Sequence, residues 1–228
     1  MTDTAVLWDI DGTLLRAAGT GVRCFTAALH TVAGVQFPAG SVDMGGRTDP
    51  DIAAAILAAA GIDDLDLVPL MLAEVAALYA RHEDEFRAIT EPKPGVATAL
   101  HELNASGTVQ TLVTGNIESV ARRKVAAAGL DTHLQLGLGG YGSDHTVRAE
   151  LVRISRRRLA DSGVAAAPER TWVIGDTHRD FDCARAAGVR CILVATGSQP
   201  YAELAALGAD ATFSDLTDVS RLMDIITP

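Results

Sequence analysis

Two aspartates one residue apart, Asp9 and Asp11, stand between the apolar run Ala5–Trp8 and the pair Gly12-Thr13. In an extended chain alternate side chains point the same way, so both carboxylates can address one substrate. Glycine at position 12 lets the backbone turn sharply around them. The pair is compatible with acid–base or nucleophilic chemistry on a phosphate, and also with an acidic turn that only ends a strand.

Two later loops carry groups that suit the same chemistry. Thr114-Gly115-Asn116 follows an apolar segment and stands where a helix would begin, which places hydroxyl and backbone donors where they suit a phosphoryl group. A plain helix cap is the alternative reading of these three residues. The loop of residues 175–180 carries Asp176 at a second strand end and Asp180 one turn into the next helix, where it could also serve only as a helix-start residue.

The elements that must position these loops follow an alternating pattern. Short apolar segments predict strands at 5–8, 109–113, 134–138, 171–174 and 190–195. Apolar residues at helical spacing predict helices at 95–105, 117–128, 148–160 and 180–187, with glycines 107, 129, 163 and 188 at helix ends. This alternation predicts an α/β fold with a parallel sheet covered on both faces. Ligands of such sheets bind at the carboxyl ends of the strands, where Asp9 and Asp11 fall.

One long stretch departs from the alternation. Between about residues 17 and 90 only helical patterns occur, at 22–32, 49–60 and 67–86. We therefore expect a core of residues 1–16 and 91–228 and a helical insert of residues 17–90. Linker-like residues at 19–21 and 91–95 predict a hinge that lets the insert open and close over the strand ends, and a rigid helical layer is the alternative.

In their order along the chain, the motifs 9–13, 114–116 and 175–180 resemble those of the haloacid dehalogenase superfamily. The resemblance spans nearly the whole chain. It implies a Rossmann-like core with about five parallel strands, with helices on both faces. The insert is similar to the helical cap of the first type found in phosphoglycolate phosphatases and β-phosphoglucomutases.

The resemblance implies a role for each motif residue. Asp9 would be the nucleophile that forms an aspartyl-phosphate, and Asp11 would protonate the leaving oxygen and then activate water. Thr114 would hold a phosphoryl oxygen, assisted by the backbone of Gly115 and Asn116.

The charges of this expected site indicate that it binds a metal ion. Four carboxylates beside an anionic substrate would repel it, since two like charges about 4 Å apart cost ~4 kcal/mol at an effective dielectric of 20. All-oxygen ligands together with phosphate chemistry favour Mg²⁺. By the resemblance, Asp9 and Asp176 would bind Mg²⁺ through side chains and Asp11 through its backbone carbonyl, while Asp180 would support these ligands.

The sequence departs from the family pattern at its cation, which is usually a lysine close to the helix before the fourth motif. No lysine follows Lys124, which we expect to face solvent on a helix. Arg148, at the start of the predicted helix 148–160, is the candidate replacement, with Arg153 next. Arg47, in the loop Gly45-Gly46-Arg47-Thr48-Asp49, resembles a cap residue that contacts substrate, and a surface arginine is the alternative.

The composition narrows the class of protein. The 228 residues are 48% hydrophobic and carry a net charge of −10, which argues against nucleic acid and anionic membranes as partners. No leader and no run of about 20 apolar residues is evident, so we expect a cytoplasmic protein, either a monomer or a homodimer. The cysteines, Cys24, Cys183 and Cys191, are expected to be buried structural thiols.

The sequence therefore predicts a Mg²⁺-dependent phosphatase that acts on a small phosphorylated metabolite and resembles phosphoglycolate phosphatases. A phosphomutase similar to β-phosphoglucomutase would use the same two aspartates. A protein of another class, which binds a metabolite on this fold without turnover, is the third reading. The substrate itself is left open at this point.

Overall fold

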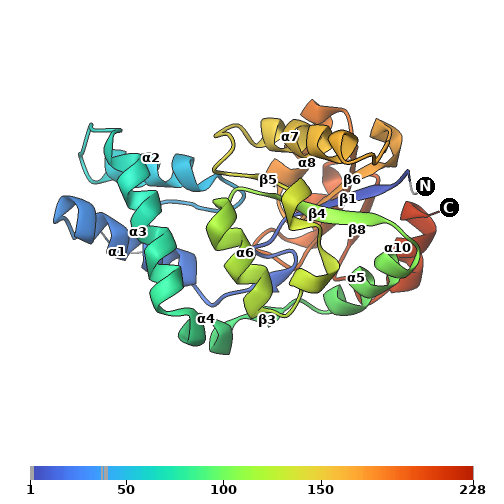
Figure 1. Ribbon diagram of the computed structural model, residues 1–228, viewed down its shortest axis with the longest axis horizontal. Helices are drawn as coiled ribbons and strands as arrows, with labels where there is room; N and C mark the ends of the chain where they lie inside the picture. Colours follow the sequence, from blue (N-terminus) through green and yellow to red (C-terminus); the bar gives the residue numbers. More distant parts are fainter. Residues whose placement is uncertain (1–2, 37, 39–40, 228) are drawn as a thin grey trace.

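A six-stranded parallel sheet forms the centre of the molecule in the computed structural model, which describes residues 3–36, 38 and 41–227 (Figure 1). Its strand order is β5-β4-β1-β6-β7-β8. The strands are β1 (Ala5–Trp8), β4 (Val109–Thr114), β5 (Gly140–Tyr141), β6 (Thr171–Gly175), β7 (Arg190–Val194) and β8 (Ala211–Phe213). The central strand β1 pairs with β4 and β6, so the carboxyl ends of these three strands meet at one edge of the sheet.

Alternating side chains of β1 pack into two separate apolar cores, one on each face of the sheet. Helices cover both faces of the sheet for this reason. Val6 and Trp8 belong to a cluster that includes residues of α5 (Val96–Ala105), α6 (Glu118–Ala127) and α10 (Val219–Ile226). Ala5 and Leu7 belong to a second cluster, formed with α7 (Arg148–Asp161), α8 (His178–Ala187) and α9 (Tyr201–Ala206). This arrangement confirms the predicted α/β fold with a two-sided parallel sheet.

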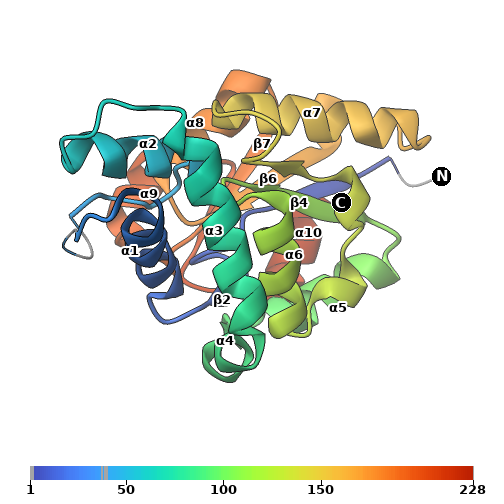
Figure 2. The same ribbon diagram turned by 60° about the vertical axis from the view of Figure 1, so that its left-hand side comes forward.

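The stretch without predicted strands is helical, and we call its four helices the helical insert. They are α1 (Thr20–Ala33), α2 (Asp49–Ala59), α3 (Leu67–Arg81) and α4 (Glu83–Ile89). The insert shares an apolar cluster with Ile117 and Val120 beside α6, and α3 lies next to α6 in both views (Figures 1 and 2). The expected division of the chain also includes residues 1–2, 37, 39–40 and 228, which lie outside the described residues.

Two very short strands connect the helical insert to the sheet. They are β2 (Leu15–Arg16) and β3 (Glu91–Pro92), which pair in antiparallel fashion as Leu15 with Pro92 and Arg16 with Glu91. The side chains of Arg16 and Glu91 form an exposed ion pair at 2.6 Å. The chain therefore enters and leaves the helical insert side by side, through the paired strands β2 and β3.

The predicted strand at 134–138 is wrong. Residues 134–135 link two single 3₁₀ turns, Asp131–His133 and Leu136–Leu138, and the strand comes later as β5. The backbone of Gln135 is already bound to β4, where its N–H donates to the Gln110 carbonyl at 2.8 Å and its carbonyl accepts from the Thr111 hydroxyl at 2.8 Å. Gly137, which has low strand propensity, interrupts the apolar run at this point.

Other differences concern lengths and ends of elements. The predicted helix 67–86 is two helices, because the backbone leaves helical geometry at His82 (φ −114°, ψ 29°). The sheet has six strands instead of about five, since β8 was not predicted. The four glycines expected at helix ends follow α5, α6, α7 and α8 with positive φ.

The predicted role of the three cysteines is confirmed, since all three are buried free thiols. Among the helices of the described residues, none is long and apolar enough to cross a membrane.

Candidate active site

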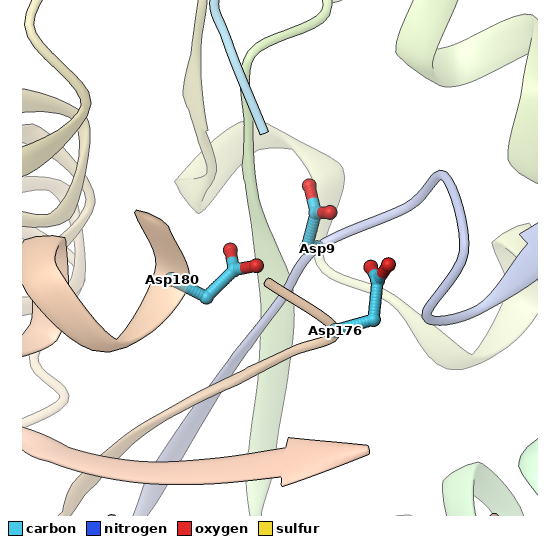
Figure 3. A group of neighbouring side chains, drawn as sticks. All are labelled: Asp9, Asp176 and Asp180. Atoms are coloured by element: carbon cyan, nitrogen blue, oxygen red, sulfur yellow. The ribbon is translucent and has the colours of Figure 1, made fainter. Parts of the chain in front are cut away.

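Three carboxylates converge at the carboxyl ends of the central strands (Figure 3). Asp9 follows β1, Asp176 follows β6, and Asp180 comes from the first turn of α8. Carboxylate oxygens of the three residues lie within 4.8 Å of one another, and all three side chains are buried. The structure thus brings together three of the four acids that the sequence predicted as a cluster.

This cluster concentrates negative charge where there is little water to screen it. Burial raises the pKa of Asp9 to about 6, and although Arg148 opposes this shift, the charges of Asp180 and Asp11 add to it. Burial and the neighbouring Asp9 also hold the pKa of Asp176 well above its ordinary value. Buried carboxylates that resist ionisation together fit a bound cation, and their all-oxygen donor set fits a hard one such as Mg²⁺.

The loops around Asp176 leave no space for a side chain at position 12 or at position 197. The Thr13 hydroxyl donates a hydrogen bond of 2.8 Å to Asp176 Oδ1. A Cβ atom at Gly12, where φ is +92°, would lie 2.4 Å from Asp176 Oδ2, and one at Gly197 would lie 1.6 Å from it. Gly12 is therefore needed for the backbone turn and also for the position of the Asp176 carboxylate.

Asp180 is both a helix cap and a member of the cluster. Its Oδ2 accepts hydrogen bonds from the Thr177 backbone N–H at 3.0 Å and from the Thr177 hydroxyl at 2.7 Å, which forms a capping box at the start of α8. Its Oδ1 accepts a hydrogen bond from Arg148. The two alternatives for this residue thus coexist, because the capped helix holds the carboxylate that binds the arginine.

Arg148 is the cation that lies against the predicted nucleophile. It is the first residue of α7, and its Nη2 atom lies 2.9 Å from Asp9 Oδ1 and also contacts Asp180. Arg153, the second candidate, lies one turn further along α7 and pairs with Glu150 at 2.5 Å. The structure therefore brings Arg148 to the acidic cluster and leaves Arg153 outside it.

Lys124 does not face solvent, so that prediction is wrong. Its side chain is only 6% exposed, and its Nζ atom lies 2.6 Å from Asp11 Oδ2 and 2.6 Å from Asn116 Oδ1. The basic run Arg122-Arg123-Lys124 is typical of a solvated helix face. In the structure, however, Lys124 belongs to the buried stripe of α6, together with Val120 and Val125. The spacing of Lys124 four residues after Val120 is the signal that could have identified it.

Asp11 lies opposite this lysine, with a side chain that is 48% exposed in the cavity above the sheet. Removal from bulk water would raise the pKa of Asp11, but the charge of Lys124 and the hydrogen bonds from Lys124 and Asn116 hold it below its ordinary value. The reverse holds for the lysine: burial disfavours its charged form, but the Asp11 carboxylate keeps the pKa of Lys124 above its ordinary value. The two groups are therefore an ion pair at neutral pH.

Thr114 and Asn116 are arranged as donors beside Asp9 and Asp11. Thr114 is fully buried at the end of β4, and its hydroxyl oxygen accepts from the Asn116 backbone N–H at 3.3 Å and from Asn116 Nδ2 at 2.9 Å. Because that oxygen accepts both bonds, its own hydrogen can be donated to a ligand. The Asn116 side chain also donates to Asp11 Oδ2 at 2.8 Å, a contact that the sequence did not predict.

The loop before α2 closes over these groups from the helical insert. Asp49 is buried, its carboxylate accepts the Ile117 N–H at 2.8 Å, and its own N–H donates to the Gly115 carbonyl at 2.7 Å. Burial raises the pKa of Asp49 to about 6, against the opposing charge of Lys124 and the bond from Ile117. Asp49 has no role among the sequence predictions, and its place at the start of a predicted helix gave no sign of this contact with the core.

Arg47 lies in the same loop and lines the cavity between the helical insert and the sheet, which has a volume of about 430 Å³. Its guanidinium binds both carboxylate oxygens of Asp51, at 2.7 and 3.0 Å. The predicted contact of Arg47 with a substrate anion stays a prediction.

Comparisons with known proteins agree with this geometry. A family model described as haloacid dehalogenase-like hydrolase matches residues 6–185. A phosphoglycolate phosphatase of Cupriavidus necator is 30% identical over 227 residues, which cover 96% of this chain and 93% of that protein. The tyrosine-protein kinase PtkA of Mycobacterium tuberculosis is 27% identical over 195 residues, 84% of this chain and 62% of that protein. A hydrolase from Pseudomonas syringae has the same fold, with a TM-score of 0.75 at 18% identity over 99% of this chain and 100% of that chain.

Proposed function

Because this chain belongs to the haloacid dehalogenase-like hydrolases, we propose that it is a Mg²⁺-dependent phosphatase that hydrolyses a small phosphorylated metabolite. The observation that carries the proposal is the buried carboxylate of Asp9 with a cation, Arg148, 2.9 Å away and a second acid, Asp11, two residues on. The similarity to a protein named phosphoglycolate phosphatase supports a small substrate of this kind. In this proposal residues 17–90 act as a cap over a core of residues 1–16 and 91–228.

The acidic cluster would hold the metal ion. Asp9 and Asp176 would contribute carboxylate oxygens and Asp11 its backbone carbonyl, while Asp180 keeps Arg148 in place. Bound Mg²⁺ neutralises carboxylate charge, so that an anionic phosphate can approach Asp9.

Asp9 would attack the phosphorus atom in the first step. A new bond forms between an Asp9 carboxylate oxygen and phosphorus, the bond from phosphorus to the ester oxygen breaks, and Asp11 gives that oxygen a proton that it first takes up from a singly protonated phosphate ester. Arg148 and the Thr114 hydroxyl would hold the phosphoryl oxygens during this transfer. The product of the step is an aspartyl-phosphate on Asp9 and a free alcohol.

Water completes the reaction in the second step. Asp11, now ionised, accepts a proton from water as the water oxygen bonds to phosphorus, and the bond between phosphorus and Asp9 breaks. The pairing of Asp11 with Lys124 favours the ionised carboxylate that this step needs. Inorganic phosphate is released and Asp9 is regenerated.

A screen of phosphorylated metabolites with and without Mg²⁺ tests this proposal, with phosphate release as the readout. Asp9→Asn should lower turnover by at least about 1,000-fold, since the neutral amide cannot attack phosphorus as the carboxylate does. Asp224→Asn changes an exposed carboxyl group on α10 and should leave turnover unchanged. Unaltered turnover in Asp9→Asn would contradict the nucleophile assignment.

The same screen separates the other two functions expected from the sequence. Isomerisation of a sugar phosphate without net phosphate release would identify a phosphomutase. Binding of a metabolite with no turnover of any ester would identify a binding protein. The presence of both acids and of Arg148 in one site favours an enzyme over a binding protein, and the similarity to proteins named phosphoglycolate phosphatase favours phosphate release over isomerisation.

A further inference from the structure

We propose that Lys124 is a positioning residue that acts through Asp11. Together with Asn116 it holds the Asp11 carboxylate by one oxygen, Oδ2, and thereby presents the other oxygen, Oδ1, for proton transfer. The inference rests on the proposed function, in which Asp11 exchanges protons with the leaving group and with water.

The contacts of Asp11 separate its two carboxylate oxygens. Lys124 Nζ donates to Oδ2 at 2.6 Å, and Asn116 Nδ2 donates to the same oxygen at 2.8 Å. Within the part of the chain that the structure describes, the hydrogen bonds to this carboxylate all fall on Oδ2. Oδ1 is therefore the oxygen that remains available to a substrate.

The two donors also hold each other in place. Lys124 Nζ donates to Asn116 Oδ1 at 2.6 Å, which closes a ring of three side chains. The second N–H of the Asn116 amide donates to the Thr114 hydroxyl at 2.9 Å, so both amide hydrogens are used. A ring of mutual hydrogen bonds fixes the rotamers of its residues more firmly than a single ion pair does.

Asp11 needs such support because its own surroundings do not fix it. Its side chain is 48% exposed in the cavity, whereas Lys124 is 6% exposed and enters from the buried stripe of α6. The lysine ammonium also lies 5.6 Å from the centre of the Tyr79 ring, which belongs to α3 of the helical insert. The fixed partner is thus the lysine, and the group that it orients is the carboxylate.

A misplaced general acid has a recognisable kinetic signature. Proton donation matters most for an ester whose leaving oxygen is strongly basic, such as an alkyl phosphate, and little for an aryl phosphate that leaves as a stable anion. If Lys124 positions Asp11, its loss should damage alkyl ester hydrolysis more than aryl ester hydrolysis. A lysine with a merely structural role would affect both esters equally.

The first experiment compares Lys124→Met, Lys124→Arg and wild type on glycerol phosphate and p-nitrophenyl phosphate. We expect Lys124→Met to lower kcat/KM about 10- to 100-fold more for the alkyl ester than for the aryl ester, and Lys124→Arg to recover most of this loss. Arg122→Met removes a neighbouring cation of α6 that pairs with Glu118 on the surface, at 2.7 Å, and should change neither value. Equal losses on both esters in Lys124→Met would overturn the inference.

The second experiment repeats the substitution where Asp11 can no longer transfer a proton. In Asp11→Asn the further change Lys124→Met should lower the residual kcat/KM by less than about threefold, because a residue that acts through Asp11 has nothing left to position. Full additivity of the two losses would show that Lys124 acts elsewhere and would overturn the inference. Thermal unfolding of each variant identifies any loss that is due to folding.

A third readout does not depend on activity. In a crystal structure of Lys124→Met we expect the Asp11 carboxylate to leave its contact with Asn116, and in Lys124→Arg to keep it. An unchanged Asp11 rotamer in Lys124→Met would contradict the positioning role even if the chain hydrolysed no phosphate ester. Loss of the proposed function would instead appear as wild-type inactivity or as full turnover by Asp9→Asn.

Discussion

At the scale of single residues, the buried carboxyl group of Asp49 makes a quantitative prediction about pH. Its pKa lies at about 6 in the folded protein against an ordinary value of 3.8, chiefly because of burial. Between these pH values the folded chain keeps a proton that the unfolded chain releases. The free energy of unfolding therefore falls as the pH rises from about 4 to about 6, and the loss persists above pH 6.

Asp49→Asn removes this titration while its amide oxygen can still accept the Ile117 N–H. The variant should gain stability relative to wild type as the pH rises from 4.5 to 7.5, by about 2 kcal/mol. Urea unfolding across this range measures the difference. In Asp51→Asn the sign should reverse and the change should fall below about pH 4, because the hydrogen bond from Arg47 holds the pKa of Asp51 below its ordinary value of 3.8. A pH-independent difference for Asp49→Asn would contradict the prediction.

The sequence identified the residues that carry chemistry better than it identified the residues that support them. Asp9, Asp176 and Arg148 follow from strand ends and from a helix start, which are local features, and the structure brings them together. Lys124 and Asp49 owe their roles to contacts 113 and 68 residues away along the chain. Apart from the spacing of Lys124 four residues after Val120, no local feature distinguishes these two residues from a solvated lysine and an ordinary residue at a helix start.

At the scale of elements, the helical insert approaches the core so closely that one position must be glycine. A Cβ atom at Gly115 would lie 1.9 Å from the Arg47 carbonyl oxygen and 2.7 Å from its carbonyl carbon. The neighbouring bond from the Asp49 N–H to the Gly115 carbonyl, at 2.7 Å, depends on this approach. Glycine at position 115 therefore permits the close approach of the Arg47 loop to the core.

Gly115→Ala should push the loop of Arg47 away from the core and leave the sheet intact. We expect KM to rise and kcat to fall, together about 10- to 100-fold in kcat/KM, with little change in the free energy of unfolding of the core. Steady-state kinetics and thermal unfolding measure the two effects. Gly137→Ala is the matched control, because a Cβ atom there has no neighbour within 4 Å. Wild-type kinetics in Gly115→Ala would show that the insert does not need this contact.

The elements themselves were predictable to the extent that their signals are local. Helices α2 and α6 and strands β1 and β7 lie within a residue or two of their predicted bounds, because each has an apolar stripe or run with a clear end. The segment 134–138 has such a run too, yet its backbone bonds to β4 in another way, which only the assembled sheet decides. Strand β8 is only three residues long and was missed for lack of pattern.

At the scale of the whole molecule, the charge of −10 and the three clustered carboxylates predict that a bound cation stabilises the folded state. Mg²⁺ that binds only the folded chain should raise the melting temperature by about 5 to 10 °C at 100 times its Kd. Because the pKa of Asp9 is about 6, protons compete with the metal, and the shift should be larger at pH 7.5 than at pH 5.5.

Thermal unfolding with and without Mg²⁺ at the two pH values measures this dependence. Asp176→Asn should abolish most of the shift, and Asp224→Asn should retain all of it. An equal shift in Asp176→Asn and in wild type would place the metal elsewhere.

The paired strands β2 and β3 also bear on how such a molecule can change over evolutionary time. Because Leu15 pairs with Pro92 and Arg16 with Glu91, the two ends of the helical insert meet as neighbours in a hairpin. A tight turn of about two residues could join Arg16 directly to Glu91 and leave the sheet continuous. Lineages could therefore lose or exchange this module in one genetic event. The event would uncover Ile117 and Val120, so any new module would need an apolar surface that fits α6.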